Sequence, residues 1–213
     1  PETKFNQLDA ESPGVIPMRK LEVDAKALKG AQVVARGDGA SVGAATGTAR
    51  FISNIHDPTI FDRFKKGDIL VAERTDPDFL TFFKLASAVL ANVGGRTSHA
   101  AITSRELAIP AVIGVGELEA LKALEGKTVT VDGSHGSVYA GSLPMVQKGE
   151  DLDVNAVKKL PTHTSIGLIL ADIDQAKVLS PLRAVPDCKV GGLRAIFVLG
   201  AIGVHYKALK AYD

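Results

Sequence analysis

Short apolar runs separated by glycine turns constrain this chain more than any other feature. Six such runs, of three to six residues each, lie at 32–35, 47–52, 68–72, 87–92, 111–113 and 128–131. Runs of this length are too short for ordinary helices and several are rich in β-branched residues, so they predict strands. Glycines and prolines between the runs limit how far each element extends. The pattern predicts a compact α/β unit in which strands outnumber helices.

Helix signals fit between these strands. Thr75-Asp76-Pro77 and the Thr97-Ser98 pair provide start signals, and Pro110 and Gly126 provide stop signals. The predicted helices begin at Thr75, at Thr97 or Ser98, and at Leu118, and the last two end near Ala108 and Leu124. The Asp132-Gly133 turn predicts a hairpin between 128–131 and 136–139. We expect a flexible turn over 37–43.

Changes of pattern divide the chain into four segments. We expect an N-terminal arm over 1–30, the α/β unit over 31–142, a polar irregular linker over 143–161, and a second unit over 162–213. The second unit has a strand at 166–170, a helix at 172–179 and a strand at 190–193, which is a βαβ pattern. Two strands cannot close a barrel, so this unit is incomplete or packs on another structure.

Composition excludes several classes of protein. Apolar residues make up 46% of the chain, charged residues 23%, and the net charge is +1, so nucleic acid is a poor default partner. No apolar run approaches the roughly 18 residues of a membrane span, and no signal peptide is evident. The single cysteine, Cys188, rules out an internal disulfide and favours the cytoplasm. From the start at Pro1 and the end at Asp213 we expect a processed product or an excised fragment.

One histidine has surroundings suited to phosphate. His99 follows Gly94-Gly95-Arg96-Thr97-Ser98 at the predicted start of a helix. Unpaired N–H groups and the positive end of the helix dipole meet there, which favours an anion and disfavours a charged imidazole ring. A neutral ring is nucleophilic, so His99 is our candidate phosphoryl acceptor. A capped histidine with only a packing role is the alternative from position alone.

The segment Gly94–Gly114 resembles the phosphohistidine signature of the PEP-utilising enzymes, whose members include phosphoenolpyruvate (PEP) synthase, pyruvate phosphate dikinase and enzyme I of the sugar phosphotransferase system. Supporting segments, at 37–47, 68–71, 75–77 and 132–139, are similar to further parts of the same domain and lie in the same order. The resemblance implies that residues 31–142 form a swivelling β/β/α phosphohistidine domain. It implies that 162–213 begin a PEP/pyruvate-binding domain, an incomplete TIM-barrel-like segment.

The C-terminal segment is similar to the early barrel of this family. Gly191–Phe197 and Ile202–His205 carry the resemblance, and the second piece favours PEP synthase over the other members. Arg194 resembles a residue that binds the phosphate of PEP. Ile196 stands where the family usually has a glutamate, so an acidic group of the barrel is missing from this chain.

The resemblance implies a phosphoryl-carrier function. In the family an ATP-grasp domain donates the β-phosphoryl group of ATP to the histidine, and the domain then swivels and phosphorylates pyruvate. The reaction converts ATP, pyruvate and water to AMP, PEP and phosphate. His99 is the implied acceptor, and the residues before it support the phosphate: Gly95, Arg96, Thr97 and Ser98. Arg96 can pair with phosphoryl oxygens through its fork of donors.

The resemblance also implies what this chain needs from outside. ATP and Mg²⁺ bind elsewhere in the enzyme, and no metal-ligand spacing occurs here. The expected partners are the ATP-grasp and PEP/pyruvate-binding domains, together with further copies in a homo-oligomer. We expect the chain to be inactive alone. The alternatives are a segment of the dikinase or of enzyme I, and, in another class, a non-catalytic assembly or docking domain.

Overall fold

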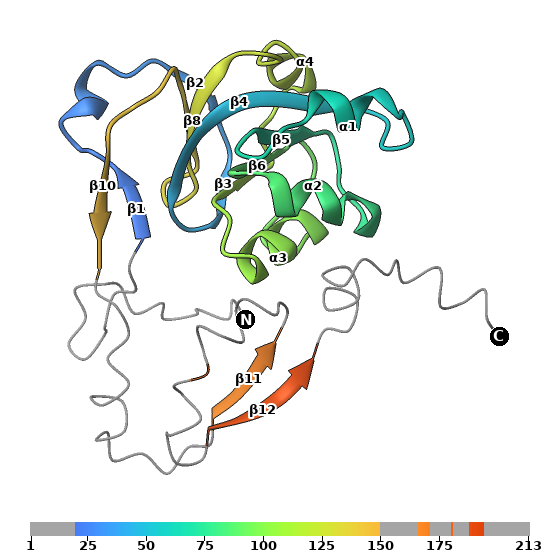
Figure 1. Cartoon of the computed structure of the whole chain (residues 1–213). Coiled ribbons are helices and arrows are strands. Elements are labelled where there is room, and N and C mark those ends of the chain that lie inside the picture. Colours follow the sequence, from blue (N-terminus) through green and yellow to red (C-terminus); the bar gives the residue numbers. More distant parts are fainter. Residues whose placement is uncertain (1–19, 150–165, 171–179, 181–187, 194–213) are drawn as a thin grey trace, which may run out of the picture.

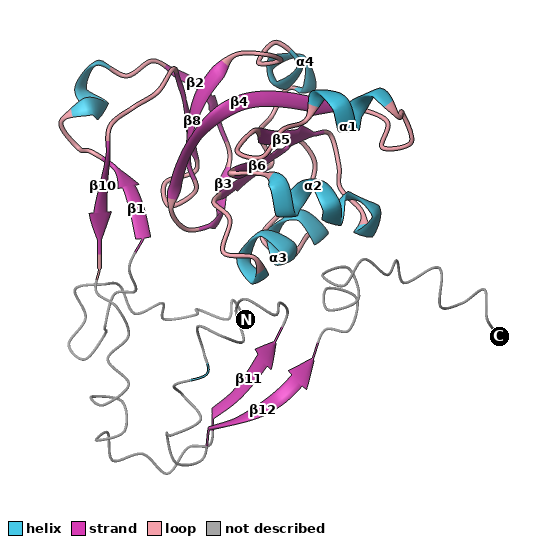
Figure 2. Ribbon diagram, viewed as in Figure 1, coloured by secondary structure: helices cyan, strands magenta, loops and turns pink. Residues whose placement is uncertain are grey.

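The computed structural model describes residues 20–149, 166–170, 180 and 188–193 of the 213-residue chain (Figure 1). Eight strands form one mixed sheet: β2 (Val33–Arg36), β3 (Asp38–Ser41), β4 (Ala44–Ile52), β5 (Ile69–Ala72), β6 (Ala88–Ala91), β7 (Ala111–Ile113), β8 (Thr128–Asp132) and β9 (Ser137–Ala140). Its spatial order is β2-β9-β8-β4-β5-β6-β7-β3. The predicted α/β class with a majority of strands is confirmed (Figure 2).

The long strand β4 joins an antiparallel half of this sheet to a parallel half. Its first residues pair antiparallel with β8, and Ala49–Ile52 pair parallel with β5. Strands β5, β6 and β7 continue in parallel. Each is buried along its whole length, as expected of parallel strands covered on both faces. The C-terminal ends of β5 and β6 therefore lie side by side.

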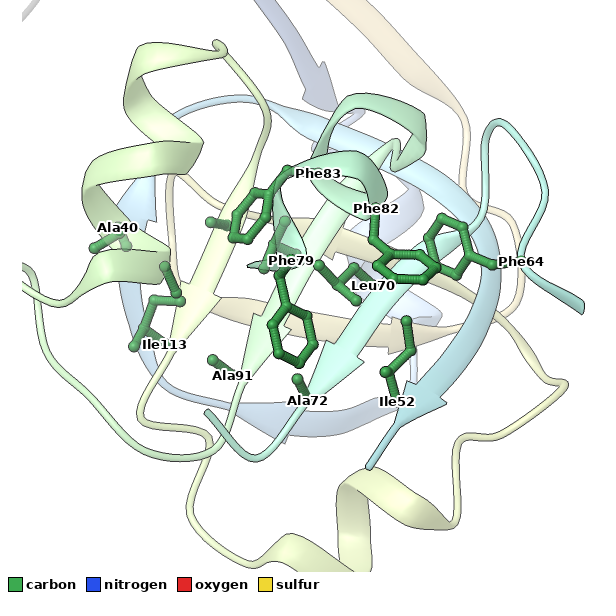
Figure 3. Close-up of a cluster of buried hydrophobic side chains, with 14 of the residues drawn as sticks. Ala40, Ile52, Phe64, Leu70, Ala72, Phe79, Phe82, Phe83, Ala91 and Ile113 are labelled. Atoms are coloured by element: carbon green, nitrogen blue, oxygen red, sulfur yellow. The ribbon is translucent and has the colours of Figure 1, made fainter. Parts of the chain in front are cut away.

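Helices cover both faces of the sheet. The helical elements are η1 (Ala27–Gly30), α1 (Thr59–Arg63), η2 (Pro77–Phe79), α2 (Leu80–Leu85), α3 (His99–Glu106) and α4 (Leu118–Lys122). Helices α2 and α3 lie on one side of the sheet and α4 on the other (Figure 1). Phe79, Phe82 and Phe83 pack over Leu70 and its neighbours on the first face (Figure 3). On the opposite face, Leu121 packs among the valines of β8 and β9.

Three segments for which the sequence predicts no strand contain one. The expected turn over 37–43 includes β3, which pairs antiparallel with β7 at the edge of the sheet. Within the expected linker, β10 (Met145–Lys148) pairs antiparallel with β1 (Lys20–Val23), which lies in the expected arm. Glycine-rich or charged edge strands carry little local signal because only one neighbour and one face select their residues. The four segment boundaries stay a prediction.

The second unit is described only in part. Strands β11 (Ile166–Leu170) and β12 (Cys188–Leu193) pair in parallel, which agrees with the expected βαβ pattern. The helix expected at 172–179 lies outside the described residues, as do Arg194 and Ile196. A parallel pair does not establish a barrel, so the incomplete TIM-barrel-like segment is not confirmed. Every helix in the described ranges is too short or too polar to traverse a lipid bilayer.

Candidate phosphohistidine site

His99 is the first residue of α3, at the end of the loop that follows β6. Of the two predicted candidates, Thr97 and Ser98, the N-cap is Ser98: its backbone is extended and its Oγ accepts a hydrogen bond from the N–H of Ala101 at 3.4 Å. The N–H of Ser98 donates to the carbonyl of Gly95 at 2.9 Å and closes the turn before the helix. The cap therefore places the histidine in the first turn, where helical N–H groups lack carbonyl partners within the helix.

Two threonine hydroxyls lie at the two nitrogens of the His99 ring. Thr75 Oγ1 is 3.2 Å from Nδ1 and Thr103 Oγ1 is 3.4 Å from Nε2, and each pair is hydrogen-bonded. Phe83 meets the ring edge-on, with 6.2 Å between ring centroids. Hydroxyls both donate and accept, so this pair of contacts suits either neutral tautomer. The ring is thus oriented without one nitrogen being committed as the proton carrier.

An open pocket of about 350 Å³ lies at the histidine. It is lined by the described residues Arg74, Thr75, Val93, Gly94, Ser98, His99 and Ala100. His99 is half-buried, whereas Thr75 is only 8% exposed. The ring therefore has solvent access on the pocket side and packing on the other, an arrangement that lets an outside group reach a fixed nucleophile.

The predicted supporting residues divide between two places. Ser98 lines the His99 pocket, while Arg96 lines a separate pocket of about 640 Å³ together with Arg105. Arg96 and Thr97 are exposed. The guanidinium of Arg105 donates to the Arg96 carbonyl at 2.8 Å and to the Ala40 carbonyl at 3.0 Å, so it ties this loop to β3.

The two glycines before Arg96 have different surroundings. Gly94 has φ +135°, and a Cβ there would lie 2.9 Å from the Cβ and Oγ of Ser98. Gly95 has no atom within 4 Å of a built Cβ. Gly94 is thus required by the backbone, whereas Gly95 leaves open space beside the histidine loop.

Sequence reasoning did not select Arg74, Thr75 or Thr103 as site residues. Thr103 had a usable signal, because it lies four residues after His99 and so on the same helix face. Thr75 lies 24 residues before His99 and reaches it because β5 and β6 are parallel neighbours. Arg74 reaches the His99 pocket for the same reason, because it precedes Thr75 in the loop after β5. In the described ranges, no group of three or more His, Cys, Asp or Glu side chains is placed to bind a metal.

Residues 64–136 match the family model "PEP-utilising enzyme, mobile domain". The matched range contains β5, β6, α3 and the whole His99 pocket. The resemblance of the signature segment to the PEP-utilising enzymes is thus confirmed, and the match covers their mobile domain.

Two curated relatives of this chain are named phosphoenolpyruvate synthase. The chain is 38% identical to the phosphoenolpyruvate synthase of Pyrococcus furiosus over 188 residues, covering 85% of this chain and 22% of that protein. It is 38% identical to the phosphoenolpyruvate synthase of Escherichia coli over 164 residues, covering 75% of this chain and 20% of that protein. The chain thus spans about a fifth of the length of these relatives. Among solved structures it is similar to the N-terminal domain of Enzyme 1 - Nitrogen, at 30% identity, a TM-score of 0.32, and coverage of 35% of this chain and 32% of that one.

Proposed function

We propose that this chain is the phosphoryl-carrier part of a PEP synthase and that His99 is the residue that carries the phosphoryl group. The observation that supports this most directly is the environment of the His99 imidazole. Two threonine hydroxyls orient the ring through contacts that suit its neutral form, and the ring lies at the start of a helix beside an open pocket. The relatives named phosphoenolpyruvate synthase support the choice of reaction. The geometry also favours a chemical role over a purely structural cap, because Ser98 already provides the cap.

The proposed chemistry is the formation and later cleavage of one P–N bond. A ring nitrogen of His99 uses its lone pair to attack the β-phosphorus of ATP, and the bond from that phosphorus to the α,β-bridging oxygen breaks so that AMP leaves. Water then hydrolyses the bond to the γ-phosphate, which leaves as inorganic phosphate. The phosphorylated nitrogen must release its threonine hydroxyl, and the other threonine still orients the ring. The enolate oxygen of pyruvate then takes the phosphoryl group, which breaks the P–N bond and restores the imidazole. First-turn N–H groups, Gly95, Thr97 and Ser98 stabilise the negative charge of the phosphoryl oxygens.

The rest of the reaction requires parts that we assign outside this chain. We propose that an ATP-grasp domain supplies ATP and Mg²⁺ and that a PEP/pyruvate-binding domain supplies pyruvate. Arg194 belongs to the latter in this proposal. The domain around His99 swivels between the two sites, within a cytoplasmic homo-oligomer. This division predicts that the chain alone does not make PEP from ATP and pyruvate.

Labelling tests the acceptor. The chain is incubated with β-³²P-ATP, Mg²⁺ and a PEP synthase relative whose histidine aligned with His99 has been replaced, so that the relative supplies only its ATP site. We expect label on the chain that is acid-labile and base-stable, and its loss in His99→Ala. His56→Ala is the matched control, because His56 is an exposed loop histidine far along the chain from the site. Label that persists in His99→Ala would sink the assignment.

The same assay separates the neighbouring reactions. Label transfer that requires inorganic phosphate would favour the dikinase, whereas release of AMP and phosphate without that requirement favours the synthase. Label donated by PEP but not by ATP would favour enzyme I. No label from any donor would favour the docking-domain alternative.

A further inference from the structure

Arg74 lies beside the histidine although 25 residues of sequence separate them. It follows β5 and directly precedes Thr75, whose hydroxyl is hydrogen-bonded to His99 Nδ1. Both Arg74 and Thr75 line the His99 pocket. Arg74 is therefore the sequence neighbour of a residue that contacts the proposed nucleophile, His99.

Hydrogen bonds fix the backbone on both sides of Arg74. The N–H of Val93 donates to the Glu73 carbonyl at 2.8 Å, which joins the loop after β5 to the loop after β6. On the other side, Asp76 caps η2 by accepting from the N–H of Asp78 at 2.8 Å. A cation on a fixed backbone loses less conformational entropy when it meets a ligand than one on a mobile loop.

The charge of Arg74 is not used by a carboxylate of the described residues. Arg50 and Arg63 both form ion pairs with Glu125, whereas no ion pair within the described ranges involves Arg74. None of the residues that line the His99 pocket is acidic. The pocket thus combines one guanidinium, hydroxyls and a helix N-terminus, which is a donor set for a phosphate dianion.

Arg96, the arginine that the sequence favours, has a different position. It lines the larger pocket beside Arg105 and not the pocket of His99. Its carbonyl is tied to Arg105, which sets the direction of the loop. The two arginines are therefore separable by experiment.

We infer that Arg74 is the cation that pairs with phosphate oxygens at His99. The inference rests on the proposed function, because a phosphoryl group on His99 is the ligand that Arg74 would meet. It names a binding residue that the helix-start signal does not include, and it makes Arg96 dispensable for phosphate binding in this pocket. The fork of the guanidinium suits two oxygens of one phosphate group.

Titration with inorganic phosphate tests the inference without any phosphoryl transfer. The ring resonances of His99 in the full chain are followed by NMR at constant pH and ionic strength. We expect Arg74→Gln to weaken phosphate binding about tenfold, as for the loss of one charge-assisted contact. The phosphate affinity of Arg74→Lys should lie between those of wild type and Arg74→Gln, because lysine keeps the charge but lacks the forked guanidinium. Added salt should reduce the difference, since Arg74 is exposed.

Arg96→Gln is the matched control and should change the affinity less than twofold. Equal affinity of Arg74→Gln and the wild-type chain would overturn the inference, and so would a loss in Arg96→Gln as large as in Arg74→Gln. A wild-type chain whose His99 resonances do not respond to phosphate would overturn it too. Phosphate binding through Arg74 with no ³²P label on His99 would instead refute the proposed function alone.

Discussion

Replacement of Gly94 by alanine tests how the histidine loop is built. Gly94 has φ +135°, a conformation that residues with a Cβ rarely adopt. A Cβ at this position would lie 2.9 Å from Ser98 Cβ and Oγ and 3.2 Å from Ile113 Cγ2. The Ser98 hydroxyl is the cap of α3, so the added methyl group presses on the residue that begins the histidine helix.

The expected cost follows from two contributions. A non-glycine residue in this backbone region costs about 1–3 kcal/mol. Displacement of the Ser98 cap adds about 1 kcal/mol. Gly94→Ala should therefore lower the free energy of unfolding by about 2–4 kcal/mol, a large share of the roughly 5–15 kcal/mol that stabilises a typical domain.

Urea unfolding of the full chain, followed by far-ultraviolet circular dichroism, measures this cost. Gly95→Ala is the matched control: its Cβ would have no atom within 4 Å, and its φ is outside the positive region. We expect it to stay within about 0.5 kcal/mol of wild type. Ser98→Ala should cost about 1 kcal/mol alone and less in the Gly94→Ala background, where the cap is already displaced. Equal costs for the two glycine variants would refute the reasoning.

Two further predictions concern hydrogen bonds. Thr75→Val keeps the side-chain shape but removes the hydroxyl at His99 Nδ1. The ¹⁵N chemical shifts of the His99 ring should therefore change, and the free energy of unfolding should fall by about 1 kcal/mol. Unchanged ring shifts would contradict the contact. A hydrogen bond from Lys20 and a second, smaller contribution from Lys148 lower the pKa of Glu22 below its ordinary 4.5. Glu22 therefore stabilises the pairing of β1 with β10 above that ordinary pKa, and the stabilisation is lost as the pH falls through the lowered one. Protection of the β1 and β10 amides, corrected for intrinsic exchange, should fall at acidic pH in wild type and lose this pH dependence in Glu22→Gln; the same pH dependence in both would refute the role of Glu22.

Strands with strong local patterns were predictable, and those at sheet edges were not. The apolar runs that became β5, β6 and β7 are buried on both faces, so nearly every residue in them was selected for burial. Strand β3 has the sequence Asp-Gly-Ala-Ser, which has the composition of a turn. It is a strand because β7 offers it backbone hydrogen bonds. Strands β1 and β10 likewise depend on each other across more than a hundred residues.

The site was predictable only where it is local. Ser98 as the cap and His99 in the first turn follow from residues that are adjacent in the sequence. Thr103 was accessible through helical spacing, although it was not selected. Arg74 and Thr75 come from another loop, and no local pattern connects them with the histidine.

The amino-acid sequence by itself determined the strand-rich α/β class, the capped helix start and the histidine placed in its first turn, because neighbouring residues decide these features. Only the tertiary structure decided what the histidine meets. Parallel pairing of β5 with β6 brings Thr75 to His99 Nδ1 and Arg74 to the His99 pocket. Arg96 instead lines the larger pocket beside Arg105. Strand order depends on contacts between distant segments that bury apolar faces together, so it is a property of the whole sheet and of no single stretch of sequence.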